Sequence, residues 1–423
     1  MSNKMTTGTR DQLSGLLEQV ARSLDIPDHV HEEAVRKYDE LGHWLEEKDK
    51  EQGRREPSIY PQGSFRLGTV VRPISEDADY DIDLVYERDL RKSSTTQQQL
   101  KDEAGEHLES FVDFLKESHR EAPELEAGSR CWTLQYPDQF HMDILPAIPN
   151  DDRRENGGKV DATAIHITDE DLHEWQHSNP IGYGDWFKGR MLQQFLEKRA
   201  QFARAELQAK GLMLTEGMIK EAAEQVPEYK VKTPLQRAVQ ILKRHRDVHF
   251  KDDCDNRPAS IILTTLAAKS YRNEGNLVDA LINVVRGMPE HIEYRMENGK
   301  RVAWVPNPVN SEENFADRWK DKDRPDREKK FRAWLQKVEQ DMTAALKGGG
   351  IQKVVELLGT TLGRSVVTKA ASAIGLTLFE QAASGNLSMT KGTGSLVSDA
   401  TPGSTTPVRR HTFYGDHETN KDS

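Results

Sequence analysis

Three aspartates in two apolar runs are the residues of this sequence best suited to chemistry. Asp81 and Asp83 lie two residues apart in "YDIDLV", and Asp143 lies in a second apolar run, "FHMDILPAIP". Side chains alternate across a strand, so Asp81 and Asp83 face one side while the apolar residues around them face a core. Neighbouring carboxylates repel unless a cation lies between them, and a hard divalent ion such as Mg²⁺ prefers oxygen ligands. Three such carboxylates on adjacent strands predict a site for two Mg²⁺ ions, with Mn²⁺ as an alternative, serving in-line displacement at phosphorus.

A Gly-Ser pair upstream supplies the second half of the predicted site. Gly63 and Ser64 lie in "IYPQGSFRLGT", residues 59–69. A glycine lets the backbone approach a phosphate closely, and a helix that starts there offers free N–H groups and a favourable dipole. The Ser64 hydroxyl adds one more donor. We therefore expect Ser64 and the metal to bind a triphosphate together.

Each part of this pattern also has an ordinary structural explanation. A Gly-Ser pair alone is most often a turn, and an isolated D-x-D is most often a solvated loop or a helix cap. Asp77 and Asp79 share the alternation of Asp81, so a pair at 79 and 81 is an alternative register. The apolar neighbours favour 81 and 83. The joint occurrence of Gly-Ser, D-x-D and a downstream strand aspartate favours the catalytic interpretation.

Composition limits the class of protein. The chain has 423 residues, of which 35% are hydrophobic and 30% charged, and its net charge is −11. This acidic balance argues against broad binding to long nucleic acid but leaves room for a nucleoside triphosphate pocket. No apolar run is long enough to span a membrane, and the N-terminus lacks the apolar core of a secretory signal. Two cysteines cannot build a disulfide framework, so a cytoplasmic location is expected.

The patterning predicts an α+β fold of two lobes and a tail. Helical spacing and strand alternation are read from the apolar positions. The predicted helices span 10–23, 28–52, 95–118, 186–225 with a break near Gly211, 235–249, 258–272, 326–347 and 351–358, and the predicted strands span 80–87 and 139–147, with a hairpin at Asn298-Gly299. We expect a catalytic lobe with the N-terminal helices over 1–180, a helical lobe over 181–383 that closes the cleft, and a disordered Ser/Thr/Gly/Pro tail over 384–423.

The motifs resemble those of the polymerase-β superfamily of nucleotidyltransferases. More narrowly, "PQGSFRLGTVVRP" followed by "DYDIDLV" resembles the CD-NTases, the bacterial relatives of cyclic GMP–AMP synthase and oligoadenylate synthetase. The segments 179–191, 235–247 and 307–319 also resemble that branch, and the likeness covers roughly residues 55–320. The resemblance implies a polymerase-β-like lobe whose long N-terminal helix, residues 28–52, spans the back of the molecule.

The resemblance also assigns roles to single residues. Asp81, Asp83 and Asp143 would be the metal ligands, and Asp143 would assist deprotonation of the attacking ribose hydroxyl. The position of the base-stacking aromatic of the animal relative falls near Ile261, which has no ring. Lys243 has the alternative of lying on a solvated helix face. The implied substrate-binding residues are Gln62, Gly63, Ser64, Gln240, Lys243 and Ser260.

The implied activity is Mg²⁺-dependent synthesis of a cyclic di- or trinucleotide from NTPs, with ATP expected and GTP or others as alternatives. The product would be a second messenger that a separate effector binds in an anti-phage (CBASS) operon. The alternatives are a non-cyclising transferase acting on RNA or protein, and a catalytically silent regulatory module.

Two further expectations concern partners. The sequence lacks the zinc insertion of the animal DNA sensor, so activation by double-stranded DNA is not implied. In the tail, residues 408–415, "VRRHTFYG", are a candidate segment for docking to, or conjugation by, a regulatory partner. Gly415 is followed by "DHETNKDS", so the match to a conjugated terminal glycine fails.

Overall fold

The structure is a computed structural model in which two compact units are distinguished. It describes residues 7–74, 79–137, 140–150, 161–168, 175–212, 215–321, 326–347, 351–383, 388–390, 396–397 and 405–408. The larger unit is Leu24–Met342, and the smaller one joins Met1–Ser23 to Thr343–Ser423. Within the described ranges, no helix has the length and apolar character that a membrane span requires.

A mixed sheet forms the first half of the larger unit. Its strands are β1 (Ser58–Pro61), β2 (Tyr80–Glu87), β3 (Glu124–Ala127), β4 (Trp132–Tyr136), β5 (Phe140–Pro149), β6 (Ile165–Ile167) and β7 (Gln176–Ser178). They follow the order β1-β2-β5-β4-β3, with β6 on β5 and β7 on β6. Only β2 and β5 pair in parallel; every other neighbour in this described sheet is antiparallel. The two strands predicted to carry aspartates are therefore adjacent at the centre of the sheet.

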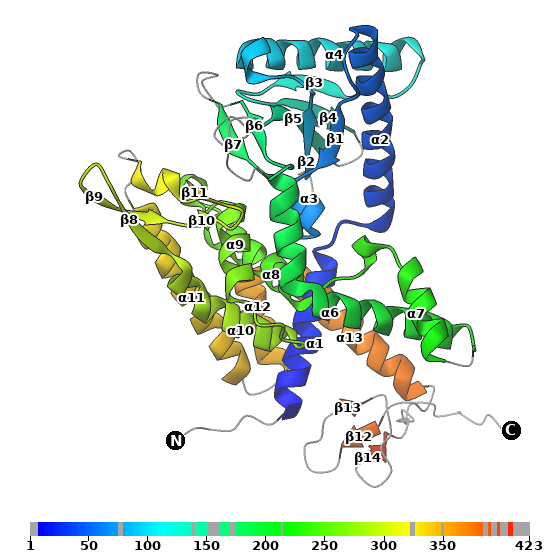
Figure 1. The fold of residues 1–423 in the computed structure, drawn as a ribbon. Helices are drawn as coiled ribbons and strands as arrows, with labels where there is room; N and C mark the ends of the chain where they lie inside the picture. The colour runs from blue at the N-terminus through cyan, green and yellow to red at the C-terminus, as the bar shows by residue number, and fades with distance from the viewer. Residues whose placement is uncertain are drawn as a thin grey trace, which may run out of the picture. The chain divides into compact units, whose positions relative to one another are not determined.

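Two long helices, α2 (Asp28–Glu51) and α4 (Gln97–Glu117), cover one face of this sheet (Figure 1). The helix α4 begins where Thr96 and Gln99 form a reciprocal capping box. Alternate residues of β2, Tyr80, Ile82, Leu84 and Tyr86, pack into one core with apolar residues of both helices. The predicted alternation is thus confirmed, and the intervening aspartates face away from this core.

A buried charge cluster lies where α2, β2 and α4 meet. Arg88 and Asp49 are each 1% exposed. Arg88 Nε donates to Asp49 Oδ1 at 3.1 Å and Arg88 Nη1 donates to Glu103 Oε2 at 2.6 Å, while the Tyr86 hydroxyl donates to Asp49 Oδ2 at 2.8 Å. Burial, as the largest influence, raises the pKa of Asp49. The Arg88–Asp49 ion pair is the centre of this cluster, and loss of either residue would leave the other buried without its charged partner.

Helices dominate the rest of the larger unit. They are α6 (Pro180–Ala209), α7 (Glu216–Gln225), α8 (Pro234–His249), α9 (Ser260–Ser270), α10 (Leu277–Gly287) and α11 (Arg327–Lys347), the last of which crosses into the smaller unit. Short 3-10 turns lie at Lys92–Ser94, Glu228–Lys230, Cys254–Asn256, Met288–His291 and Asp317–Lys320. The helix α10 is absent from the sequence prediction, although its apolar residues are buried.

Four short strands complete the larger unit: β8 (Glu293–Glu297), β9 (Lys300–Trp304), β10 (Pro306–Asn307) and β11 (Asn310–Asn314). The hairpin predicted at Asn298-Gly299 is present between β8 and β9, and both turn residues have positive φ, 49° and 74°. The mixed sheet with added helices is the predicted α+β class. The helix α6 begins at Pro180, and residues on both sides of it belong to the same unit, Leu24–Met342.

The smaller unit contains α1 (Thr7–Ser23), α12 (Ile351–Leu362) and α13 (Arg364–Ala383), and α1 packs on both of the others. The sequence analysis assigned residues 10–23 to the catalytic lobe. In the structure their apolar face, with Leu16 and Val20 each 0% exposed, packs within the smaller unit. Periodicity predicts a buried face but does not say which element covers it.

Three short strands lie in the tail that was predicted to be disordered over 384–423. They are β12 (Ser388–Thr390), β13 (Leu396–Val397) and β14 (Thr405–Pro407), and β12 pairs antiparallel with both others. Disorder is thus wrong for these residues, because backbone pairing needs few apolar side chains. Apart from residue 408, the predicted docking segment 408–415 lies outside the described residues.

Candidate active site

The strand register brings the three predicted aspartates together. In the parallel pair β2–β5, Asp83 lies opposite Asp143 and Asp81 lies opposite His141. Asp81, His141 and Asp143 each offer a ligand atom, and these atoms lie within 4.8 Å of one another. Thr133, on β4, donates its hydroxyl to Asp143 Oδ1 at 2.6 Å. The aspartates therefore form one acidic group on the face of the sheet opposite α2 and α4.

The electrostatics of this group show an excess of negative charge. Burial first, and then repulsion from Asp81 and Asp143, raise the pKa of Asp83 to about 7. Lys243 and His141 act in the opposite direction but do not offset these effects. A hydrogen bond to Asp81 is the main cause that raises the pKa of His141. Oxygen donors of this number and charge are the donor set that hard divalent ions prefer, so the residues present fit Mg²⁺ or Mn²⁺.

His141 is the site residue that the sequence analysis missed. Its Nε2 lies 3.5 Å from Asp81 Oδ1. The signal was present in "FHMDIL", because a residue two positions before Asp143 faces the same side of a strand. The alternative register is also resolved: Asp79 lies just before β2 and accepts a hydrogen bond from Gln135, whereas Asp81 and Asp83 lie inside the strand.

The Gly-Ser turn packs closely against Asp83 of β2. Gly63 starts the short helix α3 (Gly63–Leu67) with φ of 57°, and a Cβ at this position would overlap Asp83 Oδ2. The Gln62 N–H donates to the Asp83 carbonyl at 2.8 Å. Ser64 lies half-buried in the first turn of α3. Glycine is therefore required here both by the backbone conformation and by the close approach of a site carboxylate.

Replacing Gly63 by alanine is expected to remove activity for this reason. The added methyl group must displace the Asp83 carboxylate, and the left-handed backbone costs about 1 kcal/mol. Gly53→Ala is a matched control, because Gly53 also has positive φ, 70°, but meets no atom within 4 Å. Nucleotide incorporation and thermal unfolding of both variants test this. Equal activity of the two variants would contradict the role assigned to Gly63.

The basic helix α8 holds the segment that follows the Gly-Ser turn. Gln236 Nε2 donates to the Leu67 carbonyl at 3.0 Å, Gln240 Nε2 to the Val70 carbonyl at 2.9 Å, and Lys243 Nζ to the Thr69 carbonyl at 3.0 Å. The alternative of a solvated basic face for Lys243 is wrong, because its side chain is only 5% exposed. Burial is the main cause that lowers the pKa of Lys243 to about 8.

Gln240 and Ser260, the other two predicted binding residues of the helical region, form hydrogen bonds within the protein. Gln240 is 0% exposed and also donates to Asp25 Oδ1 at 2.8 Å, so its side chain is fully used inside the protein. Ser260 begins α9 and its hydroxyl accepts a hydrogen bond from Arg246 Nη1 at 2.9 Å. The structure thus brings Lys243 within electrostatic reach of Asp83. Gln240 contacts Asp25 and the Val70 carbonyl, and Ser260 contacts Arg246.

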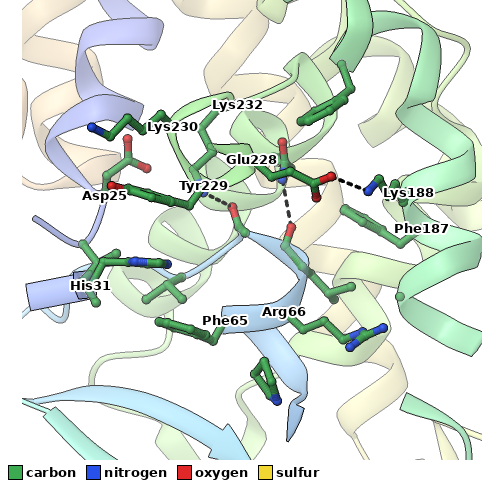
Figure 2. A pocket seen from close by; sticks show the side chains of 18 of the residues that line it. Asp25, His31, Phe65, Arg66, Phe187, Lys188, Glu228, Tyr229, Lys230 and Lys232 are labelled. Atoms are coloured by element: carbon green, nitrogen blue, oxygen red, sulfur yellow. Dashed lines mark hydrogen bonds and ion pairs between the residues drawn. The ribbon is translucent and has the colours of Figure 1, made fainter. Parts of the chain in front are cut away.

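A separate cavity of about 620 Å³ lies against α3 (Figure 2). Its walls include His31, whose ring stacks between those of Phe65 and Tyr229 at centroid distances of 4.8 and 4.2 Å. Lys232 Nζ, also in this wall, donates to the Gly68 carbonyl at 2.9 Å at the end of α3. None of the three aspartates lines this cavity. Sequence reasoning missed it because its walls come from segments far apart in the chain.

Comparison with known proteins places these motifs in a family. Residues 57–146 match the nucleotidyltransferase domain described as cyclic GMP-AMP synthase DncV-like. The chain is 30% identical over 416 residues to the c-di-GMP synthase of Roseivirga ehrenbergii, which covers 97% of this chain and 100% of the relative. It is 24% identical to the cyclic dinucleotide synthase CdnG of Bradyrhizobium diazoefficiens, over 96% of this chain and 95% of the relative.

Solved structures agree on the fold. The CD-NTase CdnG of Bradyrhizobium diazoefficiens in complex with GTP has a TM-score of 0.65 at 22% identity, over 86% of this chain and 100% of that chain. CdnC of E. coli MS115-1 with ATP has a TM-score of 0.54 at 16% identity, over 82% of this chain and 97% of that chain. Together with the nearly full-length relative, these findings show that the chain belongs to the CD-NTases, the DncV-like family of nucleotidyltransferases.

Proposed function

We propose that this chain is a divalent-metal-dependent synthase that condenses two nucleoside triphosphates into a cyclic dinucleotide. The observation that carries the proposal is the group of three carboxylates on β2 and β5 beside the Gly-Ser turn. The relatives named c-di-GMP synthase and CdnG support a dinucleotide product, and they favour GTP over the ATP expected from the sequence. The defence setting and the separate effector stay predictions of the family resemblance.

Asp81, Asp83 and Asp143 would hold the metal ions, with His141 beside them. Bound divalent ions supply charge at the α-phosphate and at the leaving pyrophosphate. Without ions, the negative charge of Asp83 is disfavoured, because burial first, and then repulsion from Asp81 and Asp143, raise its pKa. Binding of cations would relieve this repulsion.

The chemical step is displacement at the α-phosphate. The ribose hydroxyl oxygen of one nucleotide forms a bond to the α-phosphorus of the other, and the bond to the bridging oxygen of the pyrophosphate breaks. Asp143 would accept the proton of the attacking hydroxyl, and Thr133 holds its carboxylate in place by donating to Oδ1. A second, equivalent displacement within the linear intermediate closes the ring and releases a second pyrophosphate.

The donor triphosphate would lie at the start of α3. Ser64 and the backbone N–H of Gly63 would offer hydrogen bonds, Gln62 would hold the turn against Asp83, and Lys243 would supply the nearby positive charge. Gln240 acts indirectly, because it fixes the Val70 carbonyl in the segment that follows α3. A buried lysine with a lowered pKa is stabilised in its charged form when an anion binds beside it.

Product analysis tests this proposal. The pure protein is incubated with labelled GTP or ATP and Mg²⁺, treated with phosphatase, and compared with the Asp81→Ala/Asp83→Ala variant. Phosphatase-resistant label formed by the wild type alone is the expected result. Label that phosphatase removes completely would support a non-cyclising transferase instead. Products equal to those of the double variant, with every NTP tried, would overturn the catalytic proposal.

A further inference from the structure

A second cavity, of about 830 Å³, lies between the sheet and the strands β8 to β11. Aromatic rings from both sides line it: Trp175 directly precedes β7, and Trp304 and Phe315 belong to the segment that runs from β9 to β11 and just beyond it. The segment "NPVNSEENFADRW", residues 307–319, contributes much of this wall. A cavity of this size with aromatic walls suits a purine base.

One wall of this cavity belongs to the segment that leads to the carboxylate group. Arg130, in its wall, lies three residues before Thr133, the residue that holds Asp143. Asp143 also acts on the thiol of Cys131, the next residue after Arg130, whose pKa it raises as a cause second to burial. The wall also contains Ala259, which directly precedes Ser260 at the start of α9. A nucleotide whose phosphates lie at the aspartates can therefore extend its base into this cavity.

Glu313 is the residue in this wall that is built to receive hydrogen bonds. Its Oε2 accepts from Asn307 Nδ2 at 2.7 Å, and Asn307 is itself only 3% exposed. Asn307 is fixed in turn, because its Oδ1 accepts the N–H of Val309 at 3.0 Å. Among the described residues, Asn307 is the one hydrogen-bond partner of the Glu313 carboxylate, through Oε2, and no ion pair with a cationic side chain holds it. One carboxylate oxygen is thus anchored and the other is available to the cavity.

We propose that Glu313, held by Asn307, recognises the guanine base of a bound nucleotide by accepting hydrogen bonds from its N1–H and its 2-amino group. This assignment rests on the proposed function and adds the substrate base to it. Guanine presents two adjacent donors on this edge, which match an ionised carboxylate. Adenine presents one amino donor next to an acceptor nitrogen, so the same carboxylate meets a lone pair.

The energetics of Glu313 agree with this role. Burial, as the largest influence, raises the pKa of its carboxyl to about 7, and the hydrogen bond from Asn307 only partly offsets this effect. A half-buried carboxylate without a cationic partner is costly to keep ionised. Two N–H donors from a base would stabilise it, and a base that lacked one of them would leave the oxygen unpaired.

The test compares GTP with inosine triphosphate, which lacks only the 2-amino group. For the wild type we expect kcat/KM for GTP to exceed that for inosine triphosphate by roughly tenfold to a hundredfold, the usual loss when a charge-assisted hydrogen bond is missing. For Glu313→Gln we expect the two substrates to differ by less than about threefold. Glu293→Gln is the matched control, because Glu293 lies on β8 outside this cavity and should keep the wild-type ratio.

Calorimetric binding of the non-hydrolysable α,β-methylene analogues of the two nucleotides gives a readout without turnover. The same ratios are expected there, even if the proposed catalysis fails. Thermal unfolding shows whether the Glu313→Gln variant is folded. If it is unfolded, Asn307→Asp is the second variant, because it removes the hydrogen bond from Asn307 that holds the Glu313 carboxylate. A wild-type ratio preserved in a folded Glu313→Gln variant, or equal binding of both analogues by the wild type, would overturn the assignment.

Discussion

Asp83→Asn is expected to reduce nucleotide incorporation at least about a hundredfold and yet to raise the thermal stability of the metal-free protein at pH 8. Activity should fall because removing a residue that only hydrogen-bonds to a metal ligand already lowers metal affinity or activity about ten- to a hundredfold, and Asp83 is itself a proposed ligand. The gain follows because Asp83 is ionised at pH 8 beside Asp81 and Asp143, which disfavour its charge. Asparagine has nearly the same shape and no charge.

The sign of the stability effect depends on pH. The folded-state pKa of Asp83, about 7, is raised above the usual value of 3.8. Between these two values the folded protein binds a proton that the unfolded chain does not, so stability falls as the pH rises. Asp83 therefore costs nothing below the unfolded-state pKa, less at pH 5 than at pH 8, and most above pH 7. The substitution Asp83→Asn should therefore raise the melting temperature in EDTA by a few degrees at pH 8 and by clearly less at pH 5. Asp113→Asn, at an exposed position of α4, is the control and should change neither activity nor stability. An Asp83→Asn variant that is less stable than the wild type at pH 8 would contradict this account.

Arg88→Met is expected to lower the free energy of unfolding by about 3–5 kcal/mol. Arg88 donates to both Asp49 and Glu103, and its removal leaves Asp49, 1% exposed, as a buried carboxylate without its main partner. Restoring neutrality with Arg88→Met/Asp49→Asn should recover part of the loss, because the uncompensated charge is gone.

The matched control for this prediction is Arg55→Met. Arg55 forms an ion pair with Asp89 at 3.1 Å, but its side chain is 86% exposed. Solvent screening makes such a pair worth at most about 1 kcal/mol. Chemical denaturation of the three variants decides the matter: equal losses for Arg88→Met and Arg55→Met would show that the buried cluster does not stabilise the fold.

The sequence predicted the acidic face of β2 because the period of a strand is fixed. Tyr80 and Ile82 had to face one way and Asp81 and Asp83 the other, whatever the surroundings. The same rule could have identified His141, two positions before Asp143. What it could not supply is the register that sets Asp83 opposite Asp143, because pairing between distant strands depends on tertiary packing.

The sequence predicted the basic helix α8 but not what its polar side chains contact. The resemblance implied that Gln240 and Lys243 contact the substrate, and a solvated helix face was the alternative for Lys243. In the structure both side chains are buried and donate to backbone carbonyls at Val70 and Thr69. A long polar side chain can stabilise a distant loop as readily as bind a ligand, and only the fold distinguishes these uses. The same limit applies to Leu16 of α1, whose burial was predicted but whose partner was not.

The central claim, that the aspartates of β2 and β5 form a divalent-metal site, is tested most directly by Mn²⁺ binding. Electron paramagnetic resonance of free Mn²⁺ measures how many ions the protein removes from solution in the presence of a non-hydrolysable GTP analogue. The wild type is predicted to bind up to two ions per chain, and Asp81→Asn/Asp83→Asn is predicted to lose this binding while keeping its fold. Equal Mn²⁺ binding by the wild type and the double variant would contradict the claim.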